Sequence, residues 1–218
     1  FIILWIFYLL LCVGCASKQL KVDLSYTPPE RNVLDDLKPV VVSLQVVDHR
    51  PTEQQNIIGV QRNTVFGTKH ADIISKTSVI DVVNGAIKTE LERSGLKILN
   101  PEQGQGDITL IVWLKQLYFD SKASDVDIEL VGSIRSEVVA FSRVHNVPQV
   151  SFTVEVAYRD FIQKGLLRAG GLFGLWGITF TATPKNHIEN VLNGALTEFV
   201  RSFCREPKLR KILSNRNG

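Results

Sequence analysis

Two cysteines at the end of an apolar run carry the most specific chemistry in this sequence. Residues 1–13 contain no charged side chain, and the run closes with Cys12-Val13-Gly14-Cys15. A small residue directly before a cysteine at such a place resembles the bacterial lipobox, where the thiol is acylated and the cysteine then becomes the new N-terminus. We therefore expect a thioether-linked lipid on Cys15.

The apolar run predicts a lipoprotein signal peptide over residues 1–14. Its length suits the apolar core of an export signal and falls short of the roughly 20 residues that a membrane-spanning helix needs. The usual leucine three places before the modified cysteine is here Cys12, with Leu11 one place earlier. Neither an initiating Met nor a basic segment precedes the run, so we expect a truncated precursor. A secretory signal with incidental cysteines and an uncleaved anchor are the alternatives.

The residues after Cys15 indicate which membrane retains the protein. Ala16 and Ser17 follow the cysteine, whereas an aspartate directly after it would favour the inner membrane. One acyl chain binds a membrane marginally, but two or more hold a protein stably without a transmembrane helix. We expect a protein that is anchored by lipid in the outer membrane and faces the periplasm.

Cysteine usage excludes an intramolecular disulfide in the expected mature chain. Cys12 would leave with the signal peptide and Cys15 would carry lipid, so Cys204 is the remaining thiol. Cys204 follows Phe203 on a predicted helix, where a small buried side chain is favoured over a reactive thiol.

Residues that could support catalysis or bind a metal are scattered along the chain. Such sites need His, Cys or carboxylates at short spacings, and no C-x-x-C, H-E-x-x-H or G-x-S-x-G motif occurs. The histidines are far apart, at His49, His70, His145 and His187. We expect no enzymatic activity, no metal and no cofactor. A hydrolase would require that folding gathers histidines and carboxylates.

Two charged clusters have both a chemical and an ordinary interpretation. Asp125, Asp127 and Glu129 would share one strand face, which suits a cation, but the loop and glycine of an EF-hand are missing. A solvated strand face is favoured. The triplet Asp-His-Arg at 48–50 combines an acid and a base, but charged residues before a proline usually end a strand and begin a turn.

The segment 164–177 combines glycines with large apolar side chains, among them Leu172, Phe173 and Trp176. Its glycine spacing departs from the G-x-G-x-x-G order of dinucleotide-binding loops, so nucleotide binding is rejected. An exposed apolar patch is typical of contact with lipid or protein, so we expect these three residues to make that contact. The alternative is that the loop folds over the open sheet face and completes the core.

The charge distribution does not favour a nucleic-acid partner. The formal charge of +3 arises from 25 basic and 22 acidic side chains, without the clustered excess of a nucleic-acid binder. Basic residues are frequent in 201–216. Positive side chains interact favourably with the dipole at a helix C-terminus, and this interpretation is preferred. The alternative is that they bind lipid headgroups or peptidoglycan carboxylates. The expected partners are the membrane, through the lipid anchor, and an envelope protein or polymer.

Hydrophobic periodicity divides the rest of the chain into a tether and one domain. Residues 15–38 lack sustained periodicity and predict the lipidated cysteine with a flexible tether. A single α+β periplasmic domain is expected over 39–213. Its helices are predicted from the N-cap Ser78 to Gly95 and from the N-cap Thr183 to Pro207, with a terminal turn at 208–213. Its strands are predicted at 40–47, 57–60, 96–99, 108–119, 125–130, 151–158 and 177–182.

This order of elements predicts an α+β fold with a mostly antiparallel sheet of about five strands and two amphipathic helices packed on one face. The strand 108–119 has apolar residues on both sides and is expected at the centre of the sheet. The other sheet face would be wet or covered by a partner.

Three segments give the chain a resemblance to a known family. They are Leu-Glu-Arg-Ser-Gly-Leu (91–96), Ile-Thr-Leu-Ile-Val-Trp-Leu-Lys-Gln-Leu-Tyr (108–118) and Asn-His-Ile-Glu-Asn-Val-Leu-Asn-Gly-Ala-Leu (186–196). With the lipobox, their order resembles the YajG family of uncharacterised Gram-negative lipoproteins over most of residues 39–213. The resemblance implies an outer-membrane lipoprotein without defined catalytic residues.

These features predict a non-enzymatic lipoprotein of the cell envelope with a binding or accessory role in the periplasm. The alternative is an auxiliary lipoprotein of an envelope transport system that handles lipid or lipopolysaccharide. That alternative requires an apolar groove able to take an acyl chain.

Overall fold

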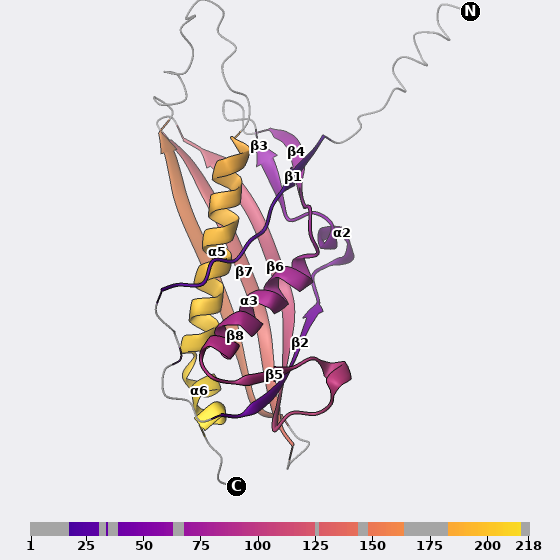
Figure 1. Cartoon of the computed structure of the whole chain (residues 1–218). Helices are drawn as coiled ribbons and strands as arrows, with labels where there is room; N and C mark the ends of the chain where they lie inside the picture. The colour runs from indigo at the N-terminus through magenta and orange to yellow at the C-terminus, as the bar shows by residue number, and fades with distance from the viewer. Residues whose placement is uncertain are drawn as a thin grey trace, which may run out of the picture.

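The computed structural model describes residues 18–30, 34, 39–62, 68–124, 127–143, 148–163 and 183–214. In these residues a mixed sheet of eight strands carries four α-helices and one 3-10 helix (Figure 1). The strands are β1 (Gln19–Val22), β2 (Val41–Asp48), β3 (Gly59–Arg62), β4 (Lys69–Ser75), β5 (Lys97–Leu99), β6 (Ile108–Ala123), β7 (Asp127–Ser142) and β8 (Pro148–Gln163). The helices are α2 (Thr52–Gln55), α3 (Val79–Arg93), η1 (Pro101–Gln103), α5 (Lys185–Arg205) and α6 (Pro207–Ser214).

The predicted fold class is wrong in its sheet. The fold is α+β, but the sheet has eight strands instead of about five and is mixed instead of mostly antiparallel. Only part of it is an antiparallel meander, formed by the long strands β6, β7 and β8. β2 runs parallel to both β5 and β6, and β1 runs parallel to β4.

The crossover through α3 explains the parallel pairing of β2 with β6. A helix that packs on the sheet returns the chain to the end where the first strand began, so the next neighbouring strand runs in the same direction. α3 lies between β2 and β6 in the sequence and packs on β2. The alternation of apolar residues in a strand is the same whether its neighbour is parallel or antiparallel. The strand sequences alone therefore do not reveal the parallel pairing.

The central strand β6 has two different strands along one edge. β7 pairs with one edge of β6, whereas on the other edge β2 pairs with residues 108–114 and β3 reaches Phe119. A bulge between Leu114 and Gln116 lies at the change from one strand to the other. A Cβ at Gly59 would lie 2.5 Å from the carbonyl oxygen of Phe119, so the lack of a side chain allows β3 to join the sheet.

The helices α3 and α5 lie on the same face of the sheet (Figure 1). α5 packs on β7 and β8, and α3 packs on β2 and α5. Fully buried side chains such as Phe119 and Phe199 fill the space between the layers. The segment predicted as a terminal turn is the helix α6, which buries Leu209 and Ile212.

The opposite face of the sheet carries charged side chains. Glu129 lies 3.1 Å from Arg159, and Arg135 lies 3.8 Å from Glu155, each pair joining neighbouring strands. Such exposed pairs contribute about 0–1 kcal/mol each, so this face adds little to stability compared with the helix-covered face.

The N-terminal segment packs on the body, so the flexible tether predicted over 15–38 is too long. β1 pairs with β4, and Val22 and Leu34 are buried in the core. Packed residues therefore already occur from residue 18 on, ahead of the domain start predicted at residue 39. Sequence periodicity missed β1 because a four-residue edge strand is too short to show a pattern.

After β1, the segment 23–30, which we call the strap, crosses α5 (Figure 1), and Pro29 near its end contacts Arg93 of α3. The backbone N–H of Asp23 donates to Glu189 at 2.8 Å, and that of Ser25 donates to Asn193 at 2.9 Å. Because helix side chains bind the strap through its backbone, the strap needs little apolar pattern of its own.

The two long helices begin differently. Ser78 caps α3 as predicted, with its Oγ accepting from the N–H of Asp81 at 3.3 Å. The predicted N-cap of α5 is wrong by one residue, because Pro184 occupies that position without a side-chain cap. Thr183 instead contacts β3, where its carbonyl accepts a hydrogen bond from Gln61 at 2.6 Å.

Candidate functional site

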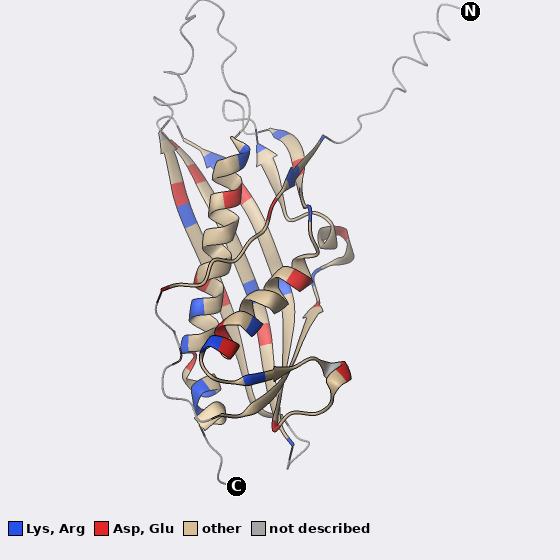
Figure 2. Cartoon of the chain, viewed as in Figure 1, with Lys and Arg blue, Asp and Glu red and all other residues tan. Residues whose placement is uncertain are grey.

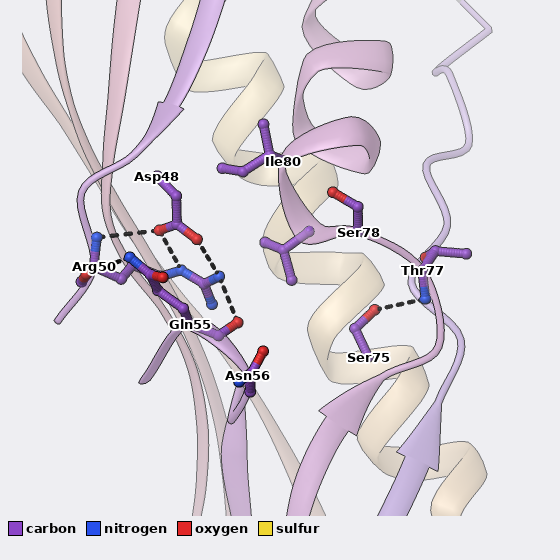
Figure 3. Close-up of a pocket in the computed structure, with 9 residues that line it drawn as sticks. Asp48, Arg50, Gln55, Asn56, Ser75, Thr77, Ser78 and Ile80 are labelled. Carbon is purple, nitrogen blue, oxygen red and sulfur yellow. Dashed lines mark hydrogen bonds and ion pairs between the residues drawn. The ribbon is translucent and has the colours of Figure 1, made fainter. Parts of the chain in front are cut away.

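A polar pocket of about 340 Å³ lies where β2 ends and α3 begins (Figure 3). The turn after β2 supplies one wall, and the segment from the end of β4 into α3 supplies the other. The lining residues are Asp48, Arg50, Gln55 and Asn56 on the first wall, and Ser75, Thr77, Ser78, Val79 and Ile80 on the second.

Arg50 and Asp48 form a two-pronged ion pair in the first wall. Arg50 Nε lies 2.9 Å from Asp48 Oδ1, and Nη2 lies 2.7 Å from Oδ2. Nη2 also donates to the carbonyl of Gln55 at 3.0 Å. The side chain of Arg50 is 1% exposed and that of Asp48 is 21% exposed. These contacts fix the guanidinium in one orientation.

The pair keeps Asp48 ionised. Burial by itself would raise the pKa of Asp48, but the hydrogen bonds from Arg50 and its positive charge outweigh burial and lower the pKa below its ordinary value. A general acid at neutral pH needs a raised carboxyl pKa. Asp48 is therefore suited to orient Arg50 and not to transfer protons.

One donor of Arg50 has no partner among the described residues. Nη1 is buried, and no acceptor among the described residues lies within hydrogen-bonding distance of it. A buried donor without a partner costs about 1–3 kcal/mol, so such groups normally bind something. The guanidinium points from the β2 wall toward the residues that precede α3 (Figure 3).

The second wall adds the start of α3. Val79 and Ile80 lie in the first turn of α3, where backbone N–H groups have no carbonyl acceptor within the helix. The helix dipole is also positive at this end. The hydroxyls of Thr77 and Ser78 lie at the same end. Donors on both walls suit a ligand with negatively charged oxygen atoms.

The structure separates the Asp-His-Arg triplet onto two faces of the sheet. Asp48 and Arg50 line the pocket on the helix-covered side, whereas the ring of His49 packs on Trp113, with 5.9 Å between ring centroids. Lys115 Nζ lies 3.4 Å from His49 Nδ1 on that open side. The triplet therefore does not form an acid–base cluster.

The carboxylates at 125–129 do not form a cation site in the residues that the structure covers. Asp125 lies outside the described residues. Glu129 pairs with Arg159, and the N–H of Asp127 is bound by Ser124 Oγ at 3.0 Å. No group of three or more potential metal ligands occurs within the described ranges.

The other predicted site residues, Cys15, Leu172, Phe173 and Trp176, lie outside the described residues. None of the described helices is long and apolar enough to cross a membrane. The burial predicted for Cys204 is confirmed, since its side chain is 0% exposed, and burial raises the pKa of the thiol to about 12.

Sequence reasoning missed this pocket as a site. Asp48 and Arg50 have the pattern of a turn, and Ser78 has the pattern of a helix cap. Both interpretations are correct locally. Nothing in the sequence indicates that the turn and the cap face each other across a cavity, because that depends on the placement of α3 against β2.

Comparisons with known proteins show the fold alone. No family model matches the chain, and no curated protein matches it. The protein XCC0632 from Xanthomonas campestris, of the DUF330 family, aligns with a TM-score of 0.59 at 10% identity, covering 92% of this chain and 100% of that one.

Two solved lipoproteins align less closely. Rare lipoprotein B from Shewanella oneidensis aligns at 8% identity and a TM-score of 0.37, covering 75% of this chain and 92% of that one. A minor lipoprotein from Acinetobacter baumannii aligns at 10% identity and a TM-score of 0.40, covering 81% and 96%. These two likenesses carry no functional argument. The resemblance to the YajG family is not confirmed by a family match.

Proposed function

We propose that this chain is a Gram-negative envelope lipoprotein of the YajG type, held in the outer membrane by lipid on Cys15. In this proposal it faces the periplasm and binds an envelope protein or polymer without catalysing a reaction.

The observation that carries the proposal is the short stretch of chain between Cys15 and the sheet. Lys18 already belongs to the packed body, because its carbonyl accepts from the N–H of Asp72 at 2.8 Å. Three residue steps separate Cys15 from Lys18, and they span at most about 11 Å. A lipid on Cys15 would therefore hold this end of the sheet close to the membrane surface.

The apolar segment 164–182 is attached at this same end. Figure 1 shows β8 ending and α5 beginning at the same end of the body as the start of β1. The hydrogen bond from Gln61 to Thr183 supports this placement, since Gln61 pairs with Ala71, next to Asp72. A lipid anchor and an apolar segment rooted at one end of the body support a membrane contact by that segment.

Basic side chains also occur at this end (Figure 2). Lys18 and Lys122 are exposed there, at the start of β1 and near the end of β6. Lys69 lies at the start of β4 but pairs with Asp72 at 2.7 Å, so it is partly neutralised. A basic residue near an anionic lipid surface contributes about 1 kcal/mol of attraction.

The transport alternative lacks support from the two pockets described here. The pocket beside α3 has a polar lining, and a second one of about 500 Å³ along β2 is lined by Asn84, Asn100 and Glu102 among others. Neither is the apolar groove that an acyl chain needs.

The anchor is tested by comparing two cysteine variants of the full precursor. Cys15→Ala should abolish processing, remove the acyl mass from the intact protein and release it from the outer-membrane fraction. Cys204→Ala is the control, since it removes a thiol that lies outside the lipobox and should leave processing and location unchanged. A processed, membrane-bound Cys15→Ala protein would contradict the proposal.

The membrane contact is tested by tryptophan fluorescence of the mature protein in vesicles. Removal of the signal peptide leaves two tryptophans, Trp113 and Trp176. With Trp113→Phe, only Trp176 emits, and lipids brominated on their acyl chains should quench it. With Trp176→Phe, Trp113 on the open sheet face should stay unquenched. Equal quenching in the two variants would contradict insertion of the segment.

The three predicted contact residues are tested together. Replacing Leu172, Phe173 and Trp176 by Ser should weaken vesicle binding of the unacylated protein while its circular dichroism spectrum and unfolding midpoint stay unchanged. Unfolding of this variant would instead favour a loop that completes the core.

A further inference from the structure

We propose that the pocket between β2 and α3 binds the carboxylate of an acylated amino acid or a peptide C-terminus. This inference deepens the binding role proposed above and rests on it, but it does not depend on the lipid anchor. It names the chemistry by which a peptide-bearing envelope partner would be recognised.

The first element of the site is the unpaired Nη1 of Arg50. The bidentate pair with Asp48 and the bond to the carbonyl of Gln55 hold the guanidinium in place before any ligand arrives. A side chain that is already ordered loses little conformational entropy on binding. Arg50 is thus a preorganised donor, since its side chain is 1% exposed and Nη1 lacks an acceptor among the described residues.

The second element is the start of α3 on the opposite wall. Val79 and Ile80 provide backbone N–H groups at the positive end of a helix of 15 residues. Thr77 and Ser78 add hydroxyl groups there. A carboxylate placed between the walls would receive hydrogen bonds from the guanidinium on one side and from the helix start on the other.

The charge of the lining disfavours a ligand with two negative charges. Asp48 and Arg50 neutralise each other, and Asp81 already places a carboxylate in the first turn of α3. The helix terminus contributes about half a positive charge. This suits a carboxylate better than a phosphate group, which carries about −1.5 to −2 at neutral pH.

The size of the pocket indicates that the carboxylate is part of a larger group. The volume of about 340 Å³ leaves space beyond a carboxylate. The side chains of Gln55 and Asn56 line the pocket and can hydrogen-bond an amide, while Val79 and Ile80 offer apolar contact. An amide next to a carboxylate is the pattern at the end of a peptide.

Isothermal titration calorimetry of the mature lipidated protein in detergent tests the ligand class. The probes are N-acetylalanine in its L and D forms, its neutral amide, and inorganic phosphate. We expect at least one form of N-acetylalanine to bind and the amide to bind at least tenfold more weakly. Preference for the L or the D form distinguishes a protein C-terminus from a cell-wall peptide, and either preference supports the proposal.

A charge variant tests the location. Changing Arg50 would also destabilise the protein, so the informative variant is Ser78→Asp, which keeps a good helix cap and adds negative charge beside the pocket. It should weaken N-acetylalanine binding at least tenfold. Ser151→Asp, on the exposed side of β8, is the matched control and should bind like the unaltered protein.

Four results would overturn the proposal: no heat from either form of N-acetylalanine at millimolar concentration, equal binding of acid and amide, tighter binding of phosphate, and unchanged binding by Ser78→Asp. None of these results bears on Cys15, so the failure of the pocket and the failure of the lipid anchor are separable.

Discussion

A partly buried carboxylate–arginine pair lies near each end of the helix α3, and the two pairs differ in what covers them. At the start, Asp48 pairs with Arg50 beside the pocket. Near the end, Glu90 Oε1 accepts from Arg93 Nη1 at 2.7 Å, and the Glu90 side chain is 0% exposed. Each pair leaves one buried polar atom without a partner among the described residues, Arg50 Nη1 and Glu90 Oε2.

The strap covers the second pair. Arg93 Nη2 donates to the carbonyl of Pro29 at 2.7 Å. Burial and then the neighbouring carboxylate of Glu90 raise the pKa of Tyr26, so its hydroxyl stays protonated beside that carboxylate. A carboxylate–arginine pair therefore holds the strap in place at one end of α3, whereas the pair at the other end lines an open pocket. Cover by the chain itself distinguishes the structural pair from the candidate ligand site.

The largest effect is expected from Arg50→Ala. This change leaves Asp48 partly buried without its partner, which should lower the free energy of unfolding by about 2–3 kcal/mol. Urea unfolding followed by circular dichroism measures it. Arg159→Ala is the control, because Arg159 is 63% exposed and its surface pair should matter by less than about 0.5 kcal/mol. Equal losses in the two variants would remove the distinction between the pocket pair and a surface pair.

A smaller loss is expected from Tyr26→Phe at the strap. The variant keeps the ring but removes the hydroxyl that lies beside the buried carboxylate of Glu90, which should cost about 1 kcal/mol and speed proteolysis within 23–30. Tyr158→Phe is a matched change on β8, where the ring packs on Gly194. If Tyr26→Phe unfolds like the unaltered protein, the strap is not clamped through Glu90.

Acid should weaken the pocket pair specifically. The pKa of Asp48 is lowered in the folded state, so its contribution is present above the ordinary Asp pKa of about 4 and is lost as the pH falls through the lowered value. The stability difference between the unaltered protein and Asp48→Asn should therefore shrink below about pH 4. If this stability difference stays constant below about pH 4, the ion pair is not the source of the stability that Asp48 contributes.

The smallest effect is expected at Cys204, whose thiol should not react with an alkylating reagent in the folded protein. This thiol is buried near the strap-covered end of α3, and its pKa is raised to about 12, first by burial and then by Glu90. Iodoacetamide at pH 8 should leave the native thiol unmodified and label it fully in urea. Labelling of the folded protein would mean that this end opens as readily as the pocket end.

Sequence patterns predicted the parts of the fold that depend on neighbouring residues. The helix α3 with its Ser78 cap and the strands β6 and β8 follow from apolar spacing within single elements, whereas the strand predicted at 125–130 covers only the start of β7. β4 was missed because residues 69–75 do not alternate, and residues 177–182 lie outside the described chain. The candidate site was visible only as the turn at 48–50.

The sequence by itself determined which segments carry a lipidation motif, which faces of α3 and α5 are apolar, and that Cys204 is a buried side chain. Each depends on residue types a few positions apart. Only the tertiary structure decided that β2 runs parallel to β6, that the strap closes one end of α3, and that Arg50 faces the other end across a pocket. Those contacts join residues tens of positions apart, and the packing of whole elements brings them together.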